Sequence, residues 1–139
     1  MHISGKELLQ LIPQAAPMVM IDALSGCDEK STRTQLTVRE TNIFFADGQL
    51  QEAALIENMA QTAAARAGFF AKEKQLPVRK GFIGAIKNAE IFFLPKANDL
   101  LETSLVLTAE IGDVSVVHCQ ISVSKKICAK AEFKIFLMD

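Results

Sequence analysis

The sequence predicts an α+β domain in which a curved antiparallel sheet of about six strands wraps around one long central helix. The helix is predicted by residues 52–74, an alanine-rich run that is apolar on nearly every side and must therefore be covered by a sheet. The sheet is predicted by residues 81–137, where apolar and polar residues alternate and short reversals separate the runs. Such short connections are typical of antiparallel strands.

The composition indicates one apolar-rich domain, 1–139. Half of the 139 residues are hydrophobic, which suggests surface buried between subunits or a pocket for an apolar ligand. A net charge of −1 without a basic stripe argues against binding to nucleic acid. No apolar run approaches the ~20 residues that span a bilayer, and no signal peptide is visible. Three scattered cysteines predict free thiols in a reducing, cytoplasmic environment, and no spacing predicts a metal site or a cofactor.

The N-terminal third predicts a short helix and a strand pair. Gly5–Leu11 follows Ser4 as a helix that stops before Pro13. The apolar run Met18–Leu24 predicts the first strand, and Thr32–Arg39, with its alternating pattern, predicts a second strand paired to it.

A loop and a long helix occupy the middle of the chain. The loop, Ile43–Gly48, contains two adjacent phenylalanines, and Asp47 within it is expected to cap the helix that follows. The helix is expected to end near Pro77.

The remaining strands are predicted from continuous or alternating apolar patterns. Gly81–Leu94 is continuously apolar, so we expect it to be covered on both faces and to lie at or beside a subunit boundary. Leu101–Ile111 is expected to bury Leu105, Leu107, Ala109 and Ile111 on one face. Val114–Val123 and Ile127–Leu137 complete the sheet.

Glu57 is the strongest candidate for a functional side chain. Its neighbours at helical spacing are Ala53, Ala54, Ala60 and Gln61. Burial among such small residues raises the pKa of a carboxyl group and leaves room for a ligand, whereas Gln61 is within reach to hydrogen-bond the carboxyl. The alternative is an ordinary helix acid at a gap in the sheet.

Four segments carry a family resemblance. They are Leu-Ile-Pro-Gln-Ala-Ala-Pro followed by an apolar run and Asp (11–22), Phe44-Phe45, Glu-Asn-Met-Ala-Gln (57–61), and the glycine-containing strand with its turn (83–99). Together they resemble the hotdog-fold 3-hydroxyacyl-acyl-carrier-protein dehydratases over nearly the whole chain, in a short-loop branch of the aryl-polyene or pigment type.

The resemblance implies a homodimer that binds a thioester of an acyl carrier protein or of CoA and eliminates water without a cofactor. It implies that Glu57 is the acid and that the backbone N–H of Gly84 holds the thioester oxygen. Gln14, Gln61 and Phe45 are implied as substrate-binding residues. We expect Glu57 to line a pocket with Gln61 and the 44–50 loop, which can come from the other subunit.

The chain departs from the family at the catalytic histidine. The two positions where this family and its short-loop branch carry it are occupied by Gln49 and Gln14, and neither amide can accept a proton at neutral pH. Two alternatives therefore stay open: a hotdog thioesterase using Glu57, and a non-catalytic subunit paired with an active hotdog paralogue. His118 is expected to face solvent or an interface, and Arg66 to be a surface or interface charge.

Overall fold

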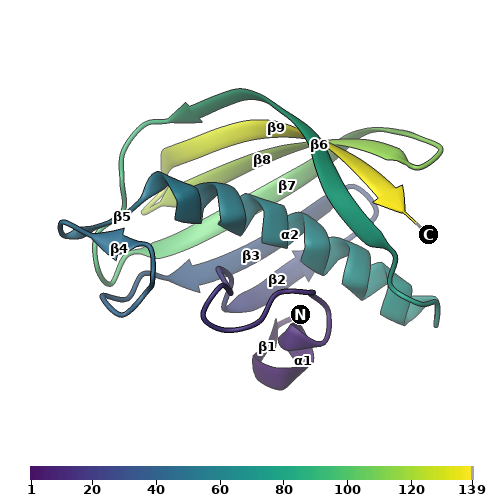
Figure 1. Cartoon of the computed structure of the whole chain (residues 1–139), viewed down its shortest axis with the longest axis horizontal. Helices are drawn as coiled ribbons and strands as arrows, with labels where there is room; N and C mark the ends of the chain where they lie inside the picture. Colours follow the sequence, from purple (N-terminus) through teal and green to yellow (C-terminus); the bar gives the residue numbers. More distant parts are fainter. Residues whose placement is uncertain (139) are drawn as a thin grey trace.

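A seven-stranded antiparallel sheet curves around one long helix in the computed structural model, which describes residues 1–138 (Figure 1). The strands lie in the order β1-β2-β3-β7-β8-β9-β6, and each neighbouring pair is antiparallel. The predicted fold class, a curved sheet around one long helix, is confirmed. The bounds are β1 Ile3–Ser4, α1 Gly5–Leu9, β2 Ala23–Cys27, β3 Ser31–Thr37, β4 Phe45–Ala46, β5 Gln49–Leu50, α2 Glu52–Glu73, β6 Lys80–Ile91, β7 Leu100–Ile111, β8 Val114–Val123 and β9 Lys126–Met138.

Helix α2 packs its buried face against the concave side of the sheet. Leu55 and Met59 are fully buried in the main core together with Leu105 of β7 and Phe133 of β9. Near its C-terminal end, α2 meets the N-terminal loop at Gly68, where a Cβ atom would overlap the carbonyl oxygen of Leu11. A glycine is needed there because the loop backbone lies directly against the helix.

The N-terminal segment differs from the prediction in both of its elements. Helix α1 ends at Leu9 rather than Leu11, and the first long strand begins at Ala23 rather than Met18. The apolar run before Ala23 is not part of a strand: side chains of α2 bind the backbone of Met20, and the Asp22 N–H donates to the Gln35 carbonyl oxygen of β3. The side-chain oxygen Oε1 of Gln61 accepts from the Met20 N–H at 2.6 Å, and Asn58 Nδ2 donates to the Met20 carbonyl oxygen at 2.7 Å.

The predicted helix cap at Asp47 is wrong. Asp47 and Gly48 have φ values of 53° and 78°, and they form the two-residue turn between β4 and β5. Left-handed backbone at both central residues is the geometry that suits a tight hairpin. The residue before α2 is Gln51, whose side-chain amide donates to the carbonyl oxygens of Ala46 and Gln49 and so fixes this hairpin.

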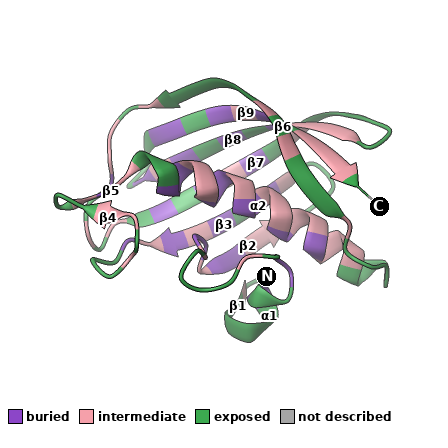
Figure 2. Cartoon of the chain, viewed as in Figure 1, coloured by how far each residue is buried: buried purple, intermediate pink, exposed green. Residues whose placement is uncertain are grey.

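Strand β6 lies at one edge of the sheet and is largely exposed (Figure 2). Phe82 and Ile86 are 49% and 43% exposed, so the chain by itself does not cover this strand on both faces as the apolar run predicted. The outer end of β7 differs too: Leu105 is buried and Leu107 half-buried, but Ala109 and Ile111 are exposed. The register shifts between Leu107 and Ala109, and such a bulge breaks the alternation of faces.

Candidate functional site

Glu57 lies in the second turn of α2, half-buried, with its carboxylate held by the next turn. Gln61 Nε2 donates to Glu57 Oε2 at 2.8 Å, as the spacing of four residues predicts. The carboxylate of Glu57 therefore has a fixed orientation before any ligand enters.

The amide of Gln61 is fully used by the protein. Its carbonyl oxygen accepts the Met20 N–H, and its two N–H groups donate to Glu57 and to the Met18 carbonyl oxygen at 2.7 Å. Gln61 is completely buried. These contacts leave the amide no N–H group with which to bind a ligand, so its evident effect is to orient Glu57 and the 18–20 segment.

A second buried amide, Asn58, extends this polar network into the core. Thr103 Oγ1 of β7 donates to Asn58 Oδ1 at 2.5 Å, and Asn58 Nδ2 binds the Met20 carbonyl oxygen. Thr62 Oγ1 donates to the Asn58 carbonyl oxygen and contacts Thr34 Oγ1 at 2.7 Å. Sequence reasoning missed this network; the signal was the pair of polar residues, Asn58 and Thr62, on the buried face of an apolar helix.

Beside Glu57 lies a cavity of about 590 Å³, enclosed by the N-terminal loop, α2 and the start of β6. We call it the Glu57 cavity. Its size lies within the range of small-molecule sites. Alanines form its helical wall, and Gln14 joins Glu57 as a polar group facing it. The lining includes Pro13, Gln14, Glu57, Ala60, Ala63, Ala64, Ala67, Gly81, Phe82 and Ile83.

Gln14 lines this cavity, and its side chain carries a buried oxygen. Its Oε1 atom is inaccessible to solvent, and no donor in the described part of the chain is within hydrogen-bond distance of it. Buried polar atoms in proteins are nearly always hydrogen-bonded, so this oxygen lacks the partner that such an atom usually has.

Three residues predicted for the site are not among those that line the Glu57 cavity: Gln61, Phe45 and Gly84. Phe45 is in β4 and packs against the main core, and the 44–50 loop does not line the cavity of its own chain. Gly84, on β6, is overlaid by the ring of Phe136, which a Cβ atom at this position would strike. Within a single chain, Glu57 and Gln14 are brought together, whereas Phe45 and Gly84 are not.

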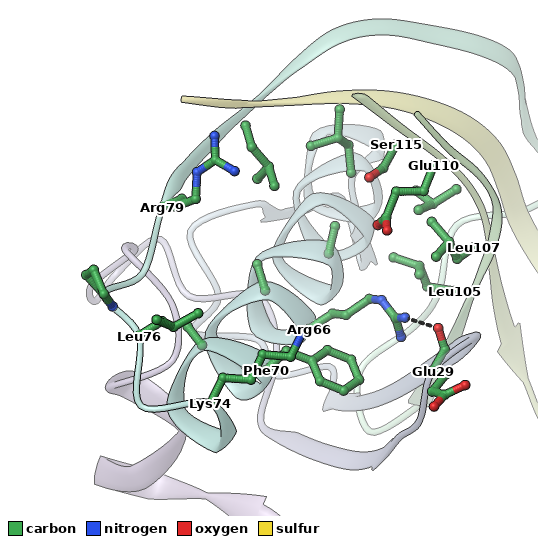
Figure 3. Close-up of a pocket in the computed structure, with 17 residues that line it drawn as sticks. Glu29, Arg66, Phe70, Lys74, Leu76, Arg79, Leu105, Leu107, Glu110 and Ser115 are labelled. Atoms are coloured by element: carbon green, nitrogen blue, oxygen red, sulfur yellow. Dashed lines mark hydrogen bonds between the residues drawn. The ribbon is translucent and has the colours of Figure 1, made fainter. Parts of the chain in front are cut away.

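A second cavity of about 580 Å³ lies under the C-terminal half of α2, at the open end of β7, β8 and β9 (Figure 3). We call it the far cavity. It shares Ala63, Ala67, Arg79, Ile135 and Leu137 with the Glu57 cavity, so the two spaces adjoin along the alanine face of α2. Polar side chains, among them Lys74, Glu110 and Ser115, stand around the far cavity, and its inner wall is aliphatic.

Arg66, which also borders the far cavity, has a structural function. Its Nη1 donates to the carbonyl oxygen of Asp28 at 2.7 Å and to Thr32 Oγ1 at 3.0 Å, and its Nη2 binds the Glu29 carbonyl oxygen (Figure 3). Its guanidinium also lies over the ring of Phe70, 4.9 Å from the centroid. Arg66 thus ties helix α2 to the turn between β2 and β3.

The other titratable candidates lie away from the cavities. His118 is exposed on β8, as predicted, and its Nε2 lies 2.9 Å from Glu132 Oε1 on β9. The three cysteines are free. Burial raises the pKa of Cys119 to about 12, and burial followed by the nearby charge of Asp99 raises that of Cys128 to about 11.

Comparison with known proteins identifies the family. The model of the ApeP dehydratases matches residues 6–139. The chain belongs to this ApeP-like dehydratase family. A curated relative, the 3-hydroxyacyl-[acyl-carrier-protein] dehydratase FabZ of Levilactobacillus brevis, is 24% identical over 136 residues, which cover 94% of this chain and 90% of the relative.

Solved structures show the same hotdog fold. The dehydratase heterocomplex ApeI:P from Xenorhabdus doucetiae matches with a TM-score of 0.86 and 17% identity, covering 95% of this chain and 91% of that chain. A hypothetical thioesterase protein with coenzyme A from Streptococcus pneumoniae TIGR4 matches with a TM-score of 0.69 and 12% identity, covering 83% and 84%. Within residues 1–138, no helix is long and apolar enough to cross a membrane.

Proposed function

We propose that this chain is the carboxylate-bearing subunit of a dehydratase that eliminates water from 3-hydroxyacyl thioesters. The observation that carries the proposal is Glu57, half-buried, oriented by Gln61 and facing a cavity whose helical wall is made of alanines. Membership of the ApeP dehydratase family supports the same reaction class.

The elimination needs an acid and a base. Glu57, once protonated, gives its proton to the leaving 3-hydroxyl group, while a base removes the proton from C2 and the C2–C3 double bond forms as water departs. Among the described residues that line the Glu57 cavity none is a histidine, and the amide of Gln14 cannot take up a proton at neutral pH. This chain alone is therefore expected to be a poor dehydratase.

The base comes from a second hotdog subunit in this proposal. Strand β6 is an edge strand with exposed Phe82 and Ile86, and an edge strand is a ready surface for pairing with another chain. Gly81, Phe82 and Ile83 of β6 line the Glu57 cavity, so a subunit paired along β6 would lie beside that cavity. A similar fold is known from a dehydratase heterocomplex, which supports a heteromeric active form.

The acyl chain extends from the Glu57 cavity into the far cavity. Ala63 and Ala67 border both spaces, and their small side chains leave a passage along α2. The aliphatic side chains of Leu105, Leu107 and Ile135 then receive the distal carbons. The thioester is carried by an acyl carrier protein or by CoA, both of which occur among the names of similar proteins.

The experiment compares this chain alone, its complex with a co-purified hotdog paralogue, and the Glu57→Gln variant of each. Crotonyl and 3-hydroxybutyryl thioesters, on CoA and on carrier protein, are assayed for hydration, dehydration and hydrolysis. We expect binding by the chain alone, dehydration by the complex, and a loss of about 10²-fold or more with Glu57→Gln, since positioned acid–base groups contribute ~10²–10⁴-fold.

Two results would contradict the proposal. Unchanged dehydration by the complex that carries Glu57→Gln would show that the Glu57 carboxylate has a structural role and no catalytic one. If the protein hydrolyses thioesters without hydrating them, and Glu57→Gln abolishes the hydrolysis, the chain is a thioesterase instead. This alternative is favoured by a helix carboxylate whose cavity is not lined by a histidine in the described part of the chain.

A further inference from the structure

The junction of the two cavities carries an inference about the length of the acyl chain. We infer that Ala63 and Ala67 determine this length: their small side chains let an acyl chain cross from the Glu57 cavity into the far cavity, and so make the protein selective for long acyl chains over short ones. The inference rests on the proposed function, because it places an acyl chain in the same cavity.

The junction is lined from two different elements. Ala63 and Ala67 of α2 border both cavities, and so do Ile135 and Leu137 of β9. Because the same helix residues and the same strand residues border both spaces, the cavities meet in the gap between α2 and β9. All four residues are half-buried, so each keeps surface that a ligand can contact.

The order of these residues along α2 separates short chains from long ones. Ala60 and Ala64 line only the Glu57 cavity, and Ala71 lines only the far cavity. Ala63 lies about 9 Å beyond Glu57 along the helix axis, because an α-helix rises about 1.5 Å per residue. A butyryl group with its reacting carbons beside Glu57 is shorter than this distance and ends within the Glu57 cavity. A dodecanoyl group has to pass the junction.

The wall beyond the junction suits the apolar end of an acyl chain. Leu105, Leu107 and Val117 line the far cavity from the sheet. Arg79 borders both cavities, but its Nη1 donates to Asp113 Oδ1 at 3.0 Å, in the turn between β7 and β8. The charge is thus held by a carboxylate that lines neither cavity. Each methylene group that reaches the aliphatic wall is removed from water and adds to the affinity.

The test measures the affinity of the purified chain for unreactive ligands of three lengths. They are CoA analogues with butyryl, octanoyl and dodecanoyl chains, in which a methylene group replaces the thioester sulfur. We expect the affinity of the unaltered protein to rise about threefold for each methylene group buried beyond the junction. Ala67→Leu fills the gap, so it should weaken the dodecanoyl ligand by about tenfold or more and leave the butyryl affinity within about twofold.

Three further variants serve as controls. Ala64→Leu, on the wall of the Glu57 cavity alone, should weaken all three ligands. Ala109→Leu, at an exposed position of β7 outside both cavities, should weaken none. Ala63→Val makes a smaller change at the junction, and it should lower the dodecanoyl affinity in the same direction even if Ala67→Leu does not fold. An unchanged butyryl affinity shows that a variant is folded.

The dependence on chain length decides the outcome. If Ala67→Leu and Ala63→Val weaken all three ligands equally, the two alanines only shape the Glu57 cavity and the inference is wrong. If the unaltered protein binds the three ligands equally well, the chain does not cross the junction; the inference is then wrong while the proposed function stands. If none of the three ligands binds, both are wrong.

Discussion

The orientation of Glu57 depends on an amide that is itself held by backbone. Gln61 binds the Met20 N–H, the Met18 carbonyl oxygen and the carboxylate, so one side chain connects the candidate acid to the strand-like segment beside it. The same hydrogen bonds that stabilise the fold therefore also prepare the site.

Replacing Gln61 should lower both stability and activity. Gln61→Leu leaves the buried Met20 N–H without its acceptor and Glu57 without its donor, and we expect a loss of about 2–4 kcal/mol in the free energy of unfolding. Urea denaturation measures this loss. Gln120→Leu, at an exposed position of β8, is the matched control and should change the free energy by less than about 0.5 kcal/mol. Equal stability of the two variants would show that the Gln61 contacts are energetically neutral.

Restoring an imidazole at position 14 should restore a base to the Glu57 cavity. Gln14 faces this cavity, whereas Gln49 lies in β5, beyond it. We therefore expect Gln14→His to raise dehydration by the chain alone by about 10²-fold or more, and Gln49→His to change it little. The rate should also rise with pH as the new imidazole loses its proton, near pH 6–7. An equal gain from both substitutions would contradict this placement.

At the scale of elements, the sequence predicts a strand best where the alternation of apolar and polar residues matches the alternation of buried and exposed positions. In β8, the buried positions Val117, Cys119, Ile121 and Val123 follow the period of two, and the strand bounds are those expected. The segment 18–21 looks equally strand-like, but its backbone is bound by Gln61 and Asn58, about 40 residues away in the chain. The pattern of residues within the segment does not predict such a distant partner.

In the candidate site too, contacts between neighbouring helix turns are predictable from the sequence, whereas contacts with distant segments are not. Glu57 and Gln61 are one turn apart on a helix, so their hydrogen bond follows from spacing. The place of Gln14 depends on how the N-terminal loop packs against Gly68, which a pattern of apolar residues does not reveal. Gly84 was expected to approach a ligand, but its missing side chain makes room for the ring of Phe136.

The buried thiols of β8 and β9 should make the protein sensitive to alkali. In the unfolded chain a thiol ionises near pH 9, but burial raises the pKa of folded Cys119 to about 12, so the folded thiol keeps its proton. The unfolded state then binds fewer protons, and the free energy of unfolding falls as pH rises from about 9 to about 12.

Removing the thiol should flatten this dependence. Between pH 9.5 and 11, Cys119→Ala should reduce the slope by up to about 1.4 kcal/mol per pH unit, even though its stability at pH 7 is lower. Urea titrations at several pH values give the slope. Ser122→Ala, on the same strand, removes no titrating thiol and should keep it. Parallel curves for all three proteins would mean that the Cys119 thiol ionises equally in both states.

At the scale of the whole molecule, the exposed edge links assembly to the site. Strand β6 is hydrogen-bonded to β9 on one side, and its exposed Phe82 stacks on Phe136 with ring centroids 5.5 Å apart. The Glu57 cavity opens along the first residues of the same strand. A second subunit paired here would bury the apolar edge and complete the wall of the cavity in one step.

We therefore predict a dimer through β6, formed with a second copy when the chain is alone and with the paralogue in the active complex. Stable obligate interfaces commonly bury ~2,000 Å² or more, so sedimentation at micromolar concentration should give the dimer mass. Ile86→Lys places two unpaired charges in that interface and should weaken dimerisation by about tenfold or more. Ile111→Lys, at an 81% exposed position at the end of β7, should not weaken it. Because a partner paired along β6 would also cover the Glu57 cavity, Ile86→Lys should reduce acyl-thioester binding in parallel with the dimer fraction. A monomeric unaltered protein, or full ligand binding by a monomeric Ile86→Lys variant, would contradict the link between assembly and site.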